Sequence, residues 1–121
     1  MKRIAFASND NQGLQGSLSA HFGRCPYYTF VDMDGDRVSE VNIVGNPYYD
    51  NHIPGAVPEF IKSKDAHVMI AGGMGPRAIE LFNQFGIEAV TTGAQGIVEN
   101  ILSAYLRGEI QGALGCEEHS H

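Results

Sequence analysis

The sequence lacks tryptophan, and only two of its 121 residues are cysteine. Two cysteines are too few to build a disulfide scaffold. No apolar run approaches the roughly 18 residues that a membrane span needs. The apolar run at residues 4–7 follows a basic start but is too short for the core of a signal peptide. These shortages predict a soluble, cytoplasmic protein whose thiols are reduced and which has no contact with a membrane.

Basic residues are also scarce, because 8 Lys and Arg stand against 14 Asp and Glu, a net charge of −6. This balance argues against a nucleic acid as the partner. Hydrophobic residues make up 43% of the chain and charged residues 18%, which excludes a disordered or coiled-coil protein. Glycine is the one residue in clear excess, with 15 copies in the chain where about 7% of residues is usual.

Local patterns predict a hairpin followed by an alternation of helices and strands. Short apolar, β-branched or aromatic runs predict strands at residues 4–7, 27–33, 38–44, 67–71 and 87–91. Asp34-Gly35 between the second and third runs is a strong hairpin signal. Helical spacing of apolar residues predicts helices that open at residue 57 and cover 78–85 and 97–106, the last two ending at Gly86 and Gly108.

This order of elements predicts an α/β fold with one domain over residues 1–108 and a flexible tail over 109–121. The expected sheet is mixed, with five strands in the order 3-2-1-4-5 and only the second strand reversed. Helices on both faces would give three layers, as in the ribonuclease-H-like arrangement. The loops that follow the four parallel strands would leave from one edge, where open α/β sheets bind ligands.

The loop after the first strand contains an imidazole, a guanidinium and a thiol, from His21, Arg24 and Cys25. Histidine and cysteine are common ligands for iron, zinc and copper, and arginine offers planar donors to an anion. The bland alternative is a structural loop in which Cys25 packs as a small buried hydrophobe.

Two glycine turns join a strand to a helix at the same predicted edge. The first, at residues 71–77, contains Gly72, Gly73 and Gly75 and could offer backbone N–H groups to an anion. It lacks the Gly-Lys-Ser/Thr ending of a Walker A loop. The second turn contains Gly93 and should neighbour the first. For both turns the alternative is a tight connection without a ligand.

The tail contains Cys116, His119 and His121, a composition that favours metal binding. An inert, solvated tail is the alternative. Enzyme motifs are missing: there is no Gly-x-Ser-x-Gly elbow and no His-Glu-x-x-His pair. A two-metal nuclease needs clustered carboxylates, and the first strand contains none.

Taken together, several segments resemble the dinitrogenase iron–molybdenum cofactor biosynthesis family, which includes NifX-like proteins and the C-terminal domain of NifB. The resemblance covers residues 2–108. It is carried by the opening strand at 2–8, the Ser-Ala-His-Phe-Gly-Arg-Cys segment at 19–25, Phe-Val-Asp at 30–32, Gly-Gly-Met-Gly at 72–75, and the Gly-x-x-Gly helix start at 93–96.

The resemblance implies a ribonuclease-H-like fold and a non-enzymatic protein that binds an iron–molybdenum cofactor, a precursor or a related metal–sulfur cluster. It implies that His21 contacts the metal, that Arg24 balances the negative charge of the cluster, and that residues 72–75 donate N–H groups. It leaves Cys25 as a candidate thiolate ligand.

Cluster donor and recipient proteins would be the partners, and the carrier would be a monomer or a homodimer. Two further alternatives stay open on the residues alone. One is a module that binds a small molecule or phosphate at residues 72–75. The other is a zinc or copper buffer formed by the tail.

Overall fold

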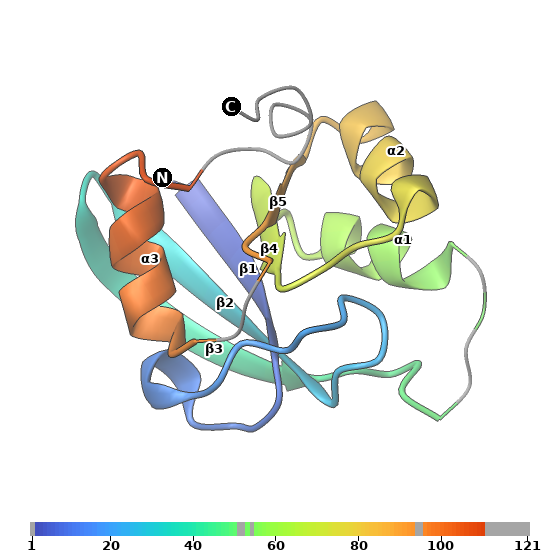
Figure 1. The fold of residues 1–121 in the computed structure, drawn as a ribbon, viewed down its shortest axis with the longest axis horizontal. Coiled ribbons are helices and arrows are strands. Elements are labelled where there is room, and N and C mark those ends of the chain that lie inside the picture. The colour runs from blue at the N-terminus through green and yellow to red at the C-terminus, as the bar shows by residue number, and fades with distance from the viewer. Residues whose placement is uncertain (1, 51–52, 54, 94–95, 111–121) are drawn as a thin grey trace.

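The computed structural model describes residues 2–50, 53, 55–93 and 96–110, which form one sheet with helices on both sides (Figure 1). Its elements are, in order, β1 (Lys2–Ser8), the 3₁₀ helix η1 (Gly13–Gln15), β2 (Tyr27–Asp34), β3 (Arg37–Gly45), α1 (Ala56–Ser63), β4 (Val68–Ala71), α2 (Pro76–Gln84), β5 (Glu88–Thr91) and α3 (Val98–Leu106).

The predicted topology is confirmed. The strand order is β3-β2-β1-β4-β5. β2 runs antiparallel to both β1 and β3, whereas β4 is parallel to β1 and β5 is parallel to β4. The carboxyl ends of β1, β3, β4 and β5 therefore meet at one edge of the sheet, as the hairpin and the two crossover helices require.

The central strand β1 is buried on both faces, which explains its unbroken apolar run. Ala5 and Ala7 face a core that α1 and α2 complete, while Ile4 and Phe6 face a second core that α3 completes. Figure 1 shows the sheet between these two helical layers. The larger side chains face the single helix α3, and the two alanines face the layer that also holds a ligand-sized pocket.

Two of the helices, α2 and α3, end where glycine permits a left-handed backbone. Gly86 and Gly108 follow α2 and α3 with φ of +77° and +78°, a conformation that costs glycine little. In the loop after β1, where the sequence predicts no helix, the structure contains the short helix η1, whose Leu14 packs on the α3 core. Leu14 is the one apolar side chain between residues 9 and 17, and a single apolar residue is too weak a signal for a helix.

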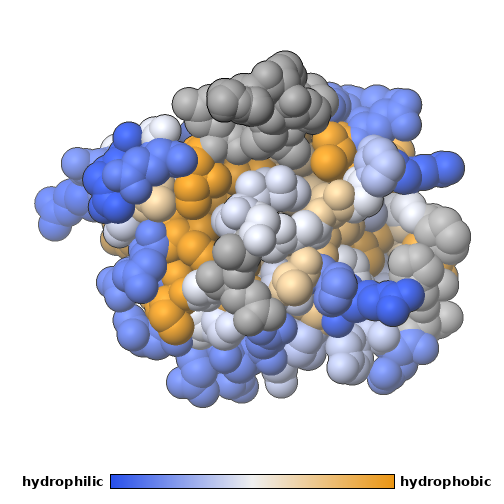
Figure 2. Space-filling model, in the orientation of Figure 1, coloured by the Kyte–Doolittle hydropathy of each residue, from blue (hydrophilic) through white to orange (hydrophobic). Residues whose placement is uncertain are grey.

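The surface is mixed in character. In the orientation of Figure 2, hydrophilic residues lie around the margin and hydrophobic surface shows beside α3. Ile97 and Leu106, at the two ends of that helix, are about two-fifths exposed. Within the described residues no helix is long and apolar enough to cross a membrane. The tail residues Cys116, His119 and His121 lie outside the described residues.

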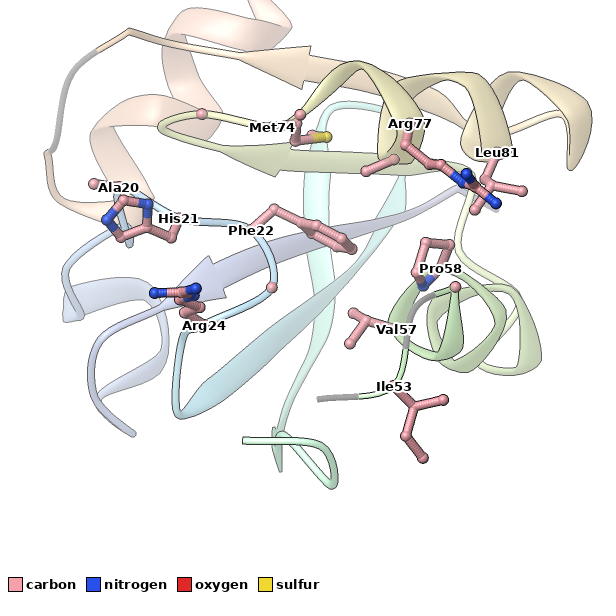
Figure 3. A pocket seen from close by; sticks show the side chains of 15 residues that line it. Ala20, His21, Phe22, Arg24, Ile53, Val57, Pro58, Met74, Arg77 and Leu81 are labelled. Carbon is pink, nitrogen blue, oxygen red and sulfur yellow. The ribbon is translucent and has the colours of Figure 1, made fainter. Parts of the chain in front are cut away.

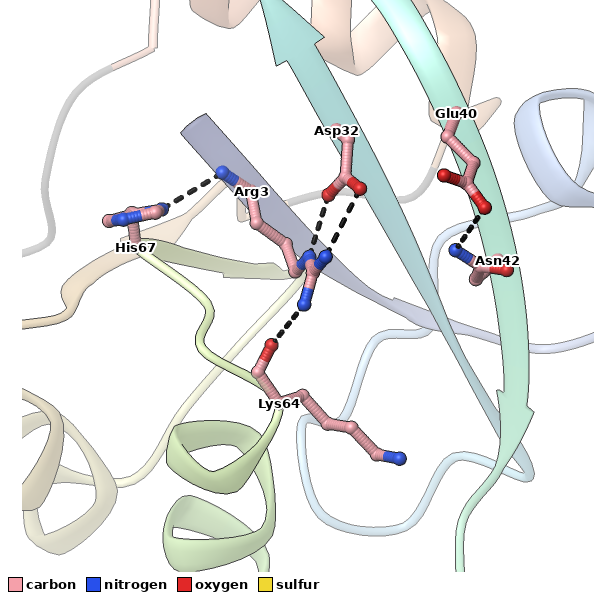
Figure 4. A network of polar contacts seen from close by, with 6 residues as sticks. All are labelled: Arg3, Asp32, Glu40, Asn42, Lys64 and His67. Atoms are coloured by element: carbon pink, nitrogen blue, oxygen red, sulfur yellow. Dashed lines mark hydrogen bonds and ion pairs between the residues drawn. The ribbon is translucent and has the colours of Figure 1, made fainter. Parts of the chain in front are cut away.

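A polar network closes the amino end of the sheet (Figure 4). Arg3 binds Asp32 with two parallel contacts, Nε to Oδ1 at 2.6 Å and Nη2 to Oδ2 at 3.1 Å, and donates from Nη1 to the carbonyl of Lys64 at 2.6 Å. The Arg3 backbone N–H donates to Nδ1 of His67 at 2.9 Å. Hydrogen bonding to Arg3 lowers the pKa of Asp32. His67 is therefore a structural residue here, and Arg3 has its charge fully paired.

Candidate ligand-binding site

A pocket of about 770 Å³ opens at the carboxyl edge of the sheet (Figure 3). Three segments line it: the loop at residues 20–24, the approach to α1 and its first turn, and the turn at residues 73–75 with the first turns of α2. Its volume falls in the range of about 300–1,000 Å³ that small-ligand sites occupy. This is the edge of the sheet at which the sequence predicts that the loops after the parallel strands meet.

Backbone hydrogen bonds tie the 19–22 loop to the ends of two strands. The Ser19 N–H donates to the carbonyl of Ala7 at 2.7 Å, and the Gly72 N–H donates to the carbonyl of Ser19 at 2.9 Å. The Phe22 N–H then donates to the carbonyl of Gly73 at 3.1 Å. The loop thus follows β4 beyond its last residue, and this pairing brings the two predicted motifs together.

Gly72 is needed for that close approach. A Cβ atom on Gly72 would lie 2.8 Å from the Cα of Ala20 and 3.0 Å from the carbonyl oxygen of Ser19, both of them backbone atoms. Its N–H is already engaged by Ser19, and Gly72 does not line the pocket. The structure therefore gives Gly72 a packing role, which differs from the N–H donor role that the resemblance implies.

His21 and Arg24 do line the pocket, from the loop side. The Ser19 hydroxyl holds the His21 backbone twice, accepting its N–H at 3.1 Å and donating to its carbonyl at 3.0 Å. Both the imidazole and the guanidinium are exposed, and Figure 3 shows them on the same side of the pocket. The loop is fixed by its backbone while these two side chains are left accessible to a ligand.

Phe22 lies between the loop and the helices and is only 7% exposed. Its ring makes an edge contact with Phe82, with centroids 5.1 Å apart. The Phe22 carbonyl accepts the Tyr28 hydroxyl at 2.8 Å. Burial raises the pKa of Tyr28, so its hydroxyl stays protonated and remains a donor. This aromatic contact and hydrogen bond make Phe22 a rigid apolar wall.

Cys25 follows the pocket loop but does not line the pocket. Its side chain is fully buried in the core beside α1 and α2, and its Sγ lies 3.5 Å from the carbonyl of Phe22. Asn46 holds the Cys25 carbonyl with a hydrogen bond of 2.9 Å. Burial raises the pKa of the thiol, which disfavours the thiolate that binds metals. In the structure, Cys25 therefore packs as a small buried hydrophobe, which is the alternative to a metal ligand that the sequence left open.

The two glycine turns differ in their relation to the pocket. Gly73 and Gly75 line it, and Gly75 is the residue that precedes the first turn of α2. Gly93 instead donates its N–H to the carbonyl of Gly72 at 3.0 Å, and it does not line the pocket. The two turns are neighbours, as predicted, and of the four glycines Gly72, Gly73, Gly75 and Gly93 only Gly73 and Gly75 line the pocket.

Sequence reasoning assigned no role to Arg77 or to the apolar walls. Arg77 lines the pocket from the first turn of α2, and Leu81 lies one helical turn further on the same face. Met74, Val57 and Pro58 add apolar surface. Pro76 offered a signal, because a proline that opens a helix places the next residue in the first turn, beside the glycines.

Among the described residues that line the pocket, every ionisable side chain is basic, namely those of His21, Arg24 and Arg77. The chain as a whole has a net charge of −6. Neither arginine forms an ion pair with another residue in the described part of the chain. Nowhere in the described part of the chain do three or more His, Cys, Asp or Glu residues form a group that could hold a metal ion. The pocket suits an anion with some apolar or polarisable surface.

The fold and the pocket together define a small three-layer α/β protein with a basic, apolar-walled ligand site. Comparison with known families identifies it further. Residues 1–108 match the family described as dinitrogenase iron–molybdenum cofactor, and the chain belongs to that family. The resemblance drawn from the sequence motifs is therefore confirmed, and the match ends where the predicted domain ends.

Individual relatives share the fold over most of their length. The crystal structure of PH0822 is 36% identical, covers 91% of this chain and 95% of its own, and superposes with a TM-score of 0.78. The apo form of the orange protein from Desulfovibrio gigas is 25% identical, with 93% of both chains covered and a TM-score of 0.81. The uncharacterised protein MJ0580 of Methanocaldococcus jannaschii is 26% identical over 113 residues, which are 92% of this chain and 91% of the relative.

Proposed function

We propose that this chain is a non-enzymatic carrier that binds an iron–molybdenum cofactor, its precursor or a related metal–sulfur cluster as cargo. The observation that carries the proposal is that every ionisable side chain among the described residues lining a pocket of about 770 Å³ is basic, although the protein as a whole is acidic. Metal–sulfur clusters of this kind are anionic, and their sulfide surfaces are polarisable. Membership of the family supports the same cargo.

Each pocket segment has a distinct part in the proposed binding. The His21 imidazole is the side chain that contacts a metal of the cargo, since histidine is a ligand for iron and other transition metals. Arg24, beside it, balances negative charge. Gly73 and Gly75 let the cargo approach the start of α2, where the helix dipole favours an anion. Cys25 has no part in the binding, because its thiol is buried.

A carrier needs to release its cargo as well as bind it. Among the described pocket residues His21 has the one imidazole, and Met74 adds only a thioether, which is a weaker ligand. A cluster that keeps its own sulfides and has one protein ligand can leave by a single exchange. We place this carrier in the cytoplasm, as a monomer or homodimer, between a protein that donates the cluster and one that receives it.

Anaerobic reconstitution with iron, sulfide and molybdate tests the proposal, read by metal content and visible absorption after gel filtration. We expect wild-type protein to retain metal and His21→Ala to lose most of it. The matched control is His67→Asn, at the opposite end of the sheet, whose amide oxygen can replace the Nδ1 acceptor for Arg3. Equal retention by wild type and His21→Ala would refute the proposal.

A second candidate, a module that binds phosphate or a small molecule at residues 72–75, is favoured by Gly73 and Gly75 in the pocket lining. Against it, the Gly72 N–H is already engaged by the Ser19 carbonyl. Calorimetry with nucleotides and phosphorylated metabolites separates the two candidates. Binding heat with any of these compounds, together with no cluster uptake, would favour the second.

Metal buffering by Cys116, His119 and His121 is tested separately by deleting all residues after Gly115. If the tail is the metal site, the truncated protein takes up no metal. If the pocket is the site, truncation leaves cluster uptake nearly unchanged.

A further inference from the structure

Arg77 lies at a position in the fold where its positive charge is unfavourable. It follows Pro76, the first residue of α2, and the first turn of this helix contains no acidic residue. A cation near the N-terminus of a helix is repelled by the helix dipole. Because His21 and Arg24, which line the same pocket, are also basic, no described pocket residue offsets this repulsion. An anion in the pocket would offset it.

Most other basic side chains of the protein have a partner within it. Of the eight Lys and Arg residues, five contact an aromatic ring or a carboxylate; these are Lys2, Arg3, Lys62, Lys64 and Arg107. Two of the other three, Arg24 and Arg77, line the pocket. The third, Arg37, begins β3 and is exposed. Cations without a described partner are thus concentrated at the pocket.

The basic side chains lie on two sides of the pocket. In Figure 3, Arg24 and His21 project from the loop, whereas Arg77 projects from α2 near Leu81, and Phe22 lies between them. A ligand that contacts both sides must therefore carry negative charge on more than one part of its surface. A ligand with a single charge can satisfy only one side.

We propose that Arg77 determines the charge selectivity of the pocket, so that an anion with two or more negative charges is preferred over a singly charged anion of the same size and shape. This inference rests on the proposed function and concerns the same site. It assigns the loop side, with Arg24, to binding any anion, and it assigns the helix side, with Arg77, to selecting those of higher charge.

Two tetrahedral thiometallates provide matched probes, since tetrathiotungstate is a dianion and tetrathiorhenate is a monoanion of similar size. Anaerobic equilibrium dialysis at low salt, read by tungsten and rhenium content, gives their dissociation constants. We expect Arg77→Gln to weaken binding of the dianion by about three- to tenfold and that of the monoanion by about twofold or less. Arg77→Lys, which keeps the charge, should restore most of the preference.

Arg37→Gln is the control, because it removes an exposed charge from β3, outside the pocket. It should leave both constants unchanged. An unchanged preference in Arg77→Gln, or an equal loss in Arg37→Gln, would overturn the assignment of Arg77. Wild-type protein that binds neither probe would overturn it as well. The proposed function would survive each of these results if the His21-dependent uptake of the reconstituted cluster is observed.

Discussion

Arginines at the two ends of the same sheet have opposite surroundings. At the amino end, Arg3 makes two contacts with Asp32 and a third with the carbonyl of Lys64. At the carboxyl end, Arg24 and Arg77 face a pocket and have no ion pair with another described residue. The paired arginine stabilises the fold, whereas the unpaired ones are available for a ligand. Stability and binding should therefore respond to different substitutions.

The largest effect on stability is expected at the pocket end, but from a backbone contact and not from a charge. Gly72→Ala places a Cβ 2.8 Å from the Cα of Ala20, and we expect it to lower the free energy of unfolding by about 2 to 3 kcal/mol, as overpacking does. Urea denaturation measures the change. Gly23→Ala is the control in the same region, because its Cβ would meet nothing within 4 Å. Equal stability of the two variants would contradict the packing role of Gly72.

A smaller loss is expected from breaking the amino-end network. Asp32→Asn removes the carboxylate that pairs with Arg3, and we expect it to lower the free energy of unfolding by about 1 to 2 kcal/mol, since Arg3 is partly exposed to solvent. Cluster uptake should stay at the wild-type level. Asp36→Asn, in the exposed turn between β2 and β3, is the control. Loss of uptake in Asp32→Asn would show that the two ends are coupled.

The same pair should make stability depend on pH. The pKa of Asp32 is lower in the folded protein than in the unfolded chain. Its contribution is therefore complete above the unfolded pKa of about 4 and is lost as the pH falls through the folded pKa. Between pH 5 and 2, urea midpoints should fall more steeply for wild type than for Asp32→Asn. Parallel curves would contradict the pairing.

The smallest effect on stability is expected from the unpaired arginine of the pocket loop. Arg24→Gln removes an exposed charge without an ion pair to a described residue, and the free energy of unfolding should change by less than about 0.5 kcal/mol. Cluster retention in the same variant should nevertheless fall severalfold. A destabilised Arg24→Gln would show that this side chain supports the loop, and the contrast between the two ends would fail.

Much of the fold could be predicted because local signals and handedness rules leave few topologies. The Asp34-Gly35 turn indicates the antiparallel pair, and the later helices indicate parallel crossovers. The candidate site was predicted less completely. His21 and Arg24 do line the pocket, yet Cys25 is buried in the core although it is the next residue. Spacing alone does not say which way a side chain in an irregular loop points.

Arg77 is the converse case, because it lines the pocket although the sequence did not single it out. Its place in the first turn of a helix could be read from Pro76, but its nearness to the pocket loop depends on the pairing of Phe22 with Gly73. This backbone hydrogen bond joins residues about fifty positions apart in the sequence.

The sequence by itself determined the strand order, the ends of α2 and α3, and the edge of the sheet at which the loops after the parallel strands meet, because these follow from periodicity, turn chemistry and chain handedness. Only the tertiary structure decided the use of each motif residue. In the folded chain the 19–22 loop packs against Gly72, the imidazole of His21 is exposed, and the thiol of Cys25 is buried in the core. Such choices depend on close contacts between distant segments, which no local pattern encodes.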